Sequence, residues 1–159
     1  MGAGWRVLTK DEWAYLFNTR TTGGTVFGTA SARYAQAEVN TDGTPTKGII
    51  LFPDGVDIAD SEVTTAGTVN NTSIWGTKCT IAQWTALAAK GCVFLPAAGK
   101  RNGTSLSGVH SDGYYWTSSP YNTDASSANC ASFLSNSLYP DVNIGRKGGC
   151  SVRLVYDVK

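Results

Sequence analysis

The chain has 159 residues and a formal net charge of +1, so it fits one domain and shows no electrostatic attraction to nucleic acid or to anionic membranes. Apolar residues make up 42% of the chain, a value typical of globular proteins, which excludes global disorder. Charged residues are only 16%, and 18 glycines accompany many serines, threonines and asparagines. This composition favours turns and loops over long helices.

The sequence gives no sign of a membrane segment or of a targeting segment. No apolar stretch approaches the length of a membrane span, and the N-terminus lacks a basic region followed by an apolar run. We therefore expect no direct membrane insertion and no export signal within the chain. A surface protein would need that signal upstream.

Two helices are predicted, each opened by a capping box. The first spans 10–19 and begins at Thr9, whose hydroxyl is paired in the box with Glu12. The second spans 81–90, and a matching box begins at Thr80. Apolar side chains at helical spacing follow both starts.

The predicted strands are short and separated by long loops. Continuous apolar runs at 47–53 and 92–96 are typical of buried strands. Further strands are predicted at 33–39, 114–118, 131–134 and 151–156. The polar segment 54–77 and the glycine-rich and serine-rich segment 97–112 are predicted as loops. This order of elements indicates an α+β fold, organised as a single domain over 1–159.

No cofactor or metal site is predicted. None of the four cysteines, Cys79, Cys92, Cys130 and Cys150, forms a CxxC motif, and His110 is the only histidine. Asp54, Asp57 and Asp60 recur every three residues, but they lack the spacing of an EF-hand calcium loop. Both disulfides and free thiols are compatible with the sequence, and a chain of this length requires no disulfide to fold.

Four spaced blocks give the chain a resemblance to a known family. The blocks cover 5–20, 48–54, 93–103 and 113–155, and together they resemble gut-bacterial and phage proteins with the C-type-lectin-like fold. This fold variant is shared with formylglycine-generating enzymes. The resemblance implies two helices packed on short, mostly antiparallel strands with long loops.

Some members of that family are variable proteins of diversity-generating retroelements, in which adenine-directed mutagenesis rewrites the last block and leaves its scaffold residues. The chain has the residues of this scaffold pattern at Trp116, Ser118, Ser119, Phe133, Arg146, Gly149, Ser151, Val152 and Arg153. Between Tyr121 and Asn143 it contains no Lys, Glu, Gln, Trp or Met, which adenine changes in Asn-type codons cannot produce. Lys147 departs from this rule.

The resemblance implies a variable ligand-binding region at about 113–150, between the scaffold residues. Tyrosine, serine and asparagine, the residues usual in diversified binding surfaces, are frequent there. The residues predicted to contact a ligand are Tyr115, Thr117, Tyr121, Asn122, Thr123, Asp124, Ser126, Ser127, Asn129, Ser135, Asn136, Tyr139, Asp141 and Asn143. Trp116 and Phe133 are expected to point into the core.

We therefore expect a non-catalytic ligand-binding module of receptor or adhesin type, located outside the cell, on a cell surface or on a virion. Its expected partner is a protein or a glycan. Two alternatives stay open. One is an enzyme related to formylglycine-generating enzymes, with Cys130 and Cys150 as its thiols. The other is a structural module of a surface or fimbrial protein.

Overall fold

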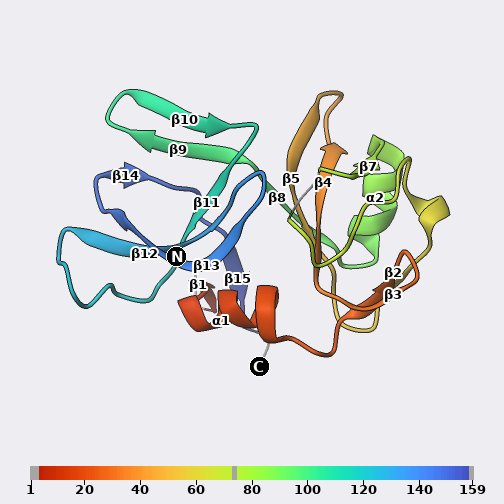
Figure 1. Cartoon of the computed structure of the whole chain (residues 1–159), viewed down its shortest axis with the longest axis horizontal. Helices are drawn as coiled ribbons and strands as arrows, with labels where there is room; N and C mark the ends of the chain where they lie inside the picture. The colour runs from red at the N-terminus through yellow and green to blue at the C-terminus, as the bar shows by residue number, and fades with distance from the viewer. Residues whose placement is uncertain (1–3, 73–74, 158–159) are drawn as a thin grey trace.

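The computed structural model describes residues 4–72 and 75–157, and within them the chain is an α+β protein (Figure 1). In these ranges the strands form four sheets, accompanied by two α-helices. In Figure 1, strands β9 to β14 gather on the left, α2 and strands β2 to β5 and β7 lie on the right, and α1 lies at the bottom near the centre, below β1 and β15. The predicted α+β class is confirmed.

Both predicted helices are present, and each starts at its predicted capping box. α1 spans Lys10–Ala14 and continues directly as a π-helical turn, η1, over Tyr15–Thr19. α2 spans Ile81–Ala89. At each start a threonine hydroxyl accepts a bond from the third helical amide, and the side chain of that third residue accepts one from the threonine amide. These bonds pair amides that the helix itself leaves free.

A four-stranded sheet contains the two apolar runs predicted as buried strands. Its strands, in spatial order, are β7 (Thr77–Cys79), β4 (Tyr34–Asn40), β5 (Pro45–Leu51) and β8 (Val93–Pro96). β4 and β5 form an antiparallel hairpin, whereas β7 runs parallel to β4. Most side chains of β4 are buried, which fits a strand that is covered on both faces.

Two smaller sheets join segments that are distant in the sequence. One contains β3 (Thr29–Ala32), β2 (Gly24–Val26) and β6 (Asp57–Ile58), followed by the 3-10 turn η2 (Asp60–Glu62). The other pairs β1 (Trp5–Val7) with β15 (Leu154–Tyr156) in antiparallel register. This second pairing brings the first and last described strands together.

The fourth sheet is built from the C-terminal half of the chain. Its strands, in order, are β10 (Ser105–Val109), β9 (Ala98–Asn102), β11 (Gly113–Trp116), β12 (Ser127–Phe133) and β13 (Leu138–Gly145), and β14 (Gly148–Gly149) pairs with β9. The prediction of a loop over 97–112 is wrong, because β9 and β10 form a hairpin there. In such polar segments the pairing partners, and not the residue types, decide that a strand forms.

Strand β5 separates two hydrophobic cores, because its successive side chains point to opposite faces. Ile50 belongs to the first core, together with Val39 and Leu87. Ile49 belongs to the second core, together with Trp13 and Phe133. Both isoleucines are fully buried.

The second core contains a continuous series of aromatic rings. In contact order the rings are Tyr34, Phe17, Trp13, Tyr115, Phe133 and Trp75, with neighbouring centroids 5.5 to 6.5 Å apart. They come from β4, η1, α1, β11, β12 and the segment before β7. The series therefore connects the C-terminal sheet to the N-terminal half of the chain.

The orientation predicted for the side chains of β11 is wrong by one residue. Tyr115 points into the second core, whereas Trp116 is only half-buried and lies on the opposite face of the strand. Phe133 is buried, as predicted. A Cβ atom at Gly113 would lie 2.1 Å from Cζ of Phe133, so this position requires glycine. Because side chains alternate along a strand, a shift of one residue exchanges the two faces.

Candidate ligand-binding surface

Most of the residues predicted to contact a ligand have exposed side chains. Nine of the fourteen are exposed, and these are Asn122, Thr123, Asp124, Ser126, Ser135, Asn136, Tyr139, Asp141 and Asn143. We call these nine residues the β13 surface. Thr117 and Tyr121, which precede these residues in the sequence, are half-buried.

The other three predicted contact residues are buried, and their prediction as surface contacts is corrected. Tyr115 lies in the second core, where its hydroxyl donates a hydrogen bond of 2.9 Å to the carbonyl oxygen of Pro96. Ser127 and Asn129 lie on β12 and are 8% and 3% exposed. β12 is an interior strand between β11 and β13, and its side chains are buried along nearly its whole length.

The centre of the β13 surface is one face of strand β13. Exposed and less exposed side chains alternate along the strand, and Tyr139, Asp141 and Asn143 share the exposed face. Asn143 lies opposite the buried Asn129 in the register of β12 and β13. The exposed side chains of β13 therefore belong to a strand that is hydrogen-bonded to the buried strand β12.

The loop between β11 and β12 forms the second part of the β13 surface. Hydrogen bonds connect the first half of this loop to α1 and to β12. The backbone amide of Lys10 donates a hydrogen bond of 3.0 Å to Oγ of Ser119. The side-chain amide of Asn129 donates one of 3.0 Å to the carbonyl oxygen of Pro120. The loop thus starts from a position fixed by both α1 and β12.

Asp124 fastens the second half of the same loop. Its carboxylate accepts hydrogen bonds of 2.7 Å from the hydroxyls of Ser127 and Ser126, and these bonds hold its pKa below the usual range. Nε of Arg146 donates a bond of 2.9 Å to the carbonyl oxygen of Ser127. The exposed Asn122 and Thr123 lie between the two fastened halves.

Lys10 joins the loop to the strand face. Its ammonium group lies 3.2 Å from Oδ2 of Asp141, while its backbone amide is bonded to Ser119. Sequence reasoning does not identify Lys10, because its ion-pair partner is 131 positions away in the chain. The pair is exposed and contributes at most about 1 kcal/mol to stability, so its main consequence is that Lys10 contacts both the loop and Asp141 on β13.

The residues predicted as scaffold differ in how firmly they are packed. Phe133 is fully buried, and Ser151 forms a parallel bridge with Tyr115. Val152 is 56% exposed, and Arg153 is also exposed. The last two residues of the pattern therefore do not support the core.

Two of the four cysteines are in direct contact. Cys130 is fully buried on β12, and its thiol interacts with that of the half-buried Cys150. This interaction lowers the pKa of Cys150 and raises the pKa of Cys130. Burial raises the pKa of Cys79 and of Cys92 to about 11. Cys150 is therefore the most readily ionised of the four thiols.

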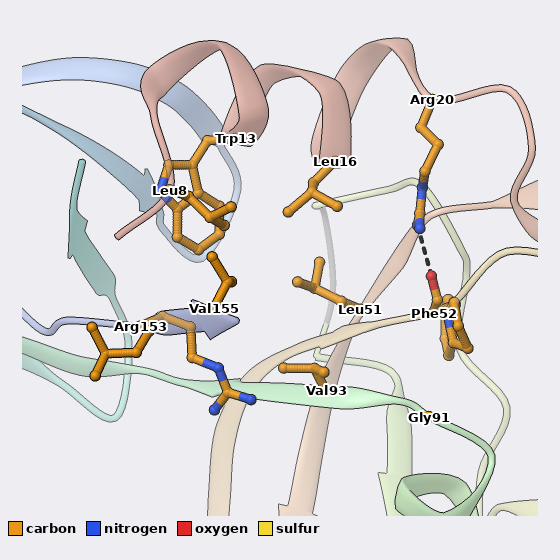
Figure 2. Close-up of a pocket in the computed structure, with 12 residues that line it drawn as sticks. Leu8, Trp13, Leu16, Arg20, Leu51, Phe52, Gly91, Val93, Arg153 and Val155 are labelled. Atoms are coloured by element: carbon orange, nitrogen blue, oxygen red, sulfur yellow. Dashed lines mark hydrogen bonds between the residues drawn. The ribbon is translucent and has the colours of Figure 1, made fainter. Parts of the chain in front are cut away.

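A hollow of about 220 Å³ lies between α1, the ends of β5 and β8, and β15 (Figure 2). Its walls are mostly aliphatic, and none of the fourteen predicted contact residues lines it. Among the described residues that line it, the charged ones are Arg20 and Arg153.

The three aspartates that recur in the 54–60 segment do not converge on one point. Asp54 lies 3.2 Å from the guanidinium of Arg20, while Asp57 belongs to β6 and Asp60 to η2. Across residues 4–72 and 75–157, no three His, Cys, Asp or Glu side chains come together in a group that could hold a metal ion. In the same ranges, no helix has the length and apolar character needed to cross a membrane.

Comparison with known proteins finds one match. Residues 55–155 match the family described as "Domain of unknown function (DUF8237)", which covers more than half of the chain. No curated protein and no solved structure matches it. The matched segment contains all nine residues of the β13 surface. The chain therefore belongs to the DUF8237 family.

Proposed function

We propose that this chain is a non-catalytic ligand-binding module of receptor or adhesin type, displayed on a cell surface or a virion, which contacts a protein or a glycan through the β13 surface. The observation that supports the proposal is the exposed face of β13. Tyr139 is 49% exposed there, and neither its side chain nor that of Asn143 forms a hydrogen bond or an ion pair with the described part of the chain. Both side chains are free to bind a partner.

The chemistry of the β13 surface suits recognition of a ligand. Tyrosine offers a large, rigid contact area at a low cost in conformational entropy, and asparagine and serine adapt their hydrogen bonds to many partners. The buried strand β12 and the fastened loop hold these side chains in place before binding, which reduces the entropy that binding would otherwise cost.

We also propose that the fold is the C-type-lectin-like variant and that the β13 surface is diversified by a retroelement. The two short helices and the short, mostly antiparallel strands are consistent with that fold. The exposed residues of the surface lie within the stretch that lacks the five residue types that adenine changes cannot produce. The proposed variable positions are therefore those where substitution disturbs folding least.

An array printed with glycans, mucins and extracellular-matrix proteins tests the binding proposal. The variant Asn122→Ala/Tyr139→Ala/Asn143→Ala should lose binding by about tenfold or more, while its melting curve stays close to that of the parent chain. Leu106→Ala is the matched control, because Leu106 is 68% exposed on β10 and lies outside the β13 surface. If the triple variant binds the same spots as tightly as the parent chain, the proposal is wrong.

A second candidate function is a structural module that assembles through strand pairing. β10 is an edge strand of the C-terminal sheet, and its Leu106 and Val109 are 68% and 42% exposed. Apolar side chains on a free edge suit the addition of a strand from a partner. In this case Leu106→Ala, and not the triple variant, would weaken association.

A further inference from the structure

The hollow beside α1 is an accessible apolar site at the rim of the second core. Leu16, Leu51, Val93 and Val155 pack against that core but remain half-buried. Figure 2 shows these four side chains arranged around one space, with Leu8 and Trp13 above Val155. The side chains come from four separate elements, so the hollow exists only in the folded chain.

Arg153 supplies a positive charge at the edge of this space. It is exposed, and its side chain has no hydrogen bond or ion pair with the described part of the chain. Figure 2 shows its guanidinium at the lower side of the hollow, below Val155 and next to Val93. Since a guanidinium is always charged in proteins, the site offers a permanent cation to an incoming anion.

Arg20 lines the other side of the hollow and is almost completely buried. One of its terminal nitrogens donates a hydrogen bond of 2.7 Å to the carbonyl oxygen of Phe52, and another lies 3.2 Å from Asp54. Its Nε is buried and has no partner within the described residues. A buried donor without a partner is costly, so a ligand that reached it would gain stability.

From these features we infer that the hollow binds a small monocarboxylate with an apolar body, of the class of medium-chain fatty acids. The volume of about 220 Å³ exceeds the roughly 150 Å³ of an apolar protein cavity that accepts benzene, and it is smaller than a site for a drug-sized ligand. The aliphatic walls bury the hydrocarbon, and Arg153 pairs with the carboxylate. None of the described lining residues is acidic.

This inference is independent of the proposed function. The lining of the hollow and the β13 surface share no residue. The chain could bind a monocarboxylate whether or not the β13 surface binds a protein or a glycan.

The test uses sodium octanoate as the probe and the methyl resonances of Leu16, Leu51, Val93 and Val155 as the readout. Octanoate should shift these signals in a saturable way. Acetate, which lacks the apolar body, should not shift them. 1-Octanol, which lacks the charge, should shift the same signals with about tenfold weaker affinity, because it cannot form the charge-assisted bond to the arginine.

Arg153→Gln should weaken octanoate binding by about tenfold and leave 1-octanol binding unchanged. Arg101→Gln is the matched control, since Arg101 is also exposed but lies on β9, away from the lining of the hollow, and it should bind octanoate like the parent chain. Two results would overturn the inference: the absence of any saturable shift with octanoate, or equal octanoate affinity in the parent chain and Arg153→Gln.

Discussion

The two cores on either side of β5 differ in composition and in the elements that they unite. In the first core the buried residues are small or aliphatic except for Phe52, whereas the second buries Trp13, Phe17, Tyr34, Tyr115 and Phe133. The first core joins α2 to the sheets of the N-terminal half, while the second joins α1 and β4 to the C-terminal sheet. Both candidate binding sites, the β13 surface and the hollow, are built on elements that meet at the second core.

We therefore propose that the second core supports both candidate sites. Large rings contact several neighbours at once, so a few of them hold together strands that are far apart in the sequence. A change in one ring should therefore disturb this core, and a change on the β13 surface should not.

Phe133→Ala should lower the free energy of unfolding by about 3–5 kcal/mol, because it removes a fully buried ring from the aromatic series. Tyr139→Ala, six residues away and exposed, should change it by less than about 0.5 kcal/mol. Urea denaturation of both variants measures the two values. Equal losses would show that the β13 surface is not separate from the core beneath it.

Gly113→Ala should cost about 1–3 kcal/mol, since the added methyl group would lie 2.1 Å from Cζ of Phe133. Phe133→Leu shortens the opposing side chain, so the double variant should lose less stability than the sum of the two single losses. A double-mutant cycle measured by urea denaturation gives the coupling. Strict additivity would mean that Gly113 is not required by this contact.

Acid should weaken the capping box of α1 and spare that of α2. Hydrogen bonds from Arg6 lower the pKa of Glu12 from its usual value of 4.5 to about 2, whereas α2 has the uncharged Gln83 at the matching position. Because the folded pKa is the lower one, the stabilisation is fully present above about pH 4.5 and is lost as the pH falls toward 2. The pair is more than a third exposed, so its contribution stays below about 1 kcal/mol.

Thermal melts of the parent chain and of Glu12→Gln, recorded over this pH range, measure the effect. The parent chain should be the more stable of the two above pH 4.5, and the difference should disappear on acidification. A difference that does not depend on pH would rule out the carboxylate as its source.

The smallest effect concerns reactivity and not stability. At near-neutral pH, Cys150 should react with iodoacetamide before Cys79 and Cys92, because the interaction with Cys130 lowers its pKa while theirs are raised to about 11. Cys130→Ala should slow the alkylation of Cys150, and Cys79→Ala should leave its rate unchanged. Peptide mass spectrometry resolves the four sites. Faster labelling of Cys79 or Cys92 would contradict the account.

The features that the sequence predicts correctly depend on short-range contacts. Both helix starts are visible because Thr9 and Thr80 make their capping bonds within three residues. The strands β5 and β8 are visible because each overlaps a continuous apolar run, 49–52 for β5 and 92–95 for β8. The α+β class follows from the order of these elements.

The errors concern strand pairing and the burial of side chains, which the residue types alone do not decide. No strand is predicted at β13, although Val142 and Ile144 alternate there with Asp141 and Asn143, and β13 pairs with β12 in the structure. Ser127 and Asn129 have polar side chains typical of an exposed loop, yet both are buried, where Ser127 donates a hydrogen bond to Asp124 and Asn129 donates one to the carbonyl oxygen of Pro120.

The sequence predicts that Trp116 faces the core, but the alternation along β11 places Tyr115 there instead. Trp116→Ala should therefore lower the free energy of unfolding by less than Phe133→Ala.

The central claim is that the β13 surface is the variable ligand-binding part of the protein. Sequencing the DNA beside this reading frame tests it most directly. We expect a reverse transcriptase gene and a near-copy of the last coding block whose adenine mismatches fall at codons for exposed residues such as Asn122, Asn136, Tyr139 and Asn143. Codons for the buried Ala131 and Phe133 should match the template. The absence of such a template, or mismatches concentrated at buried codons, would contradict the claim.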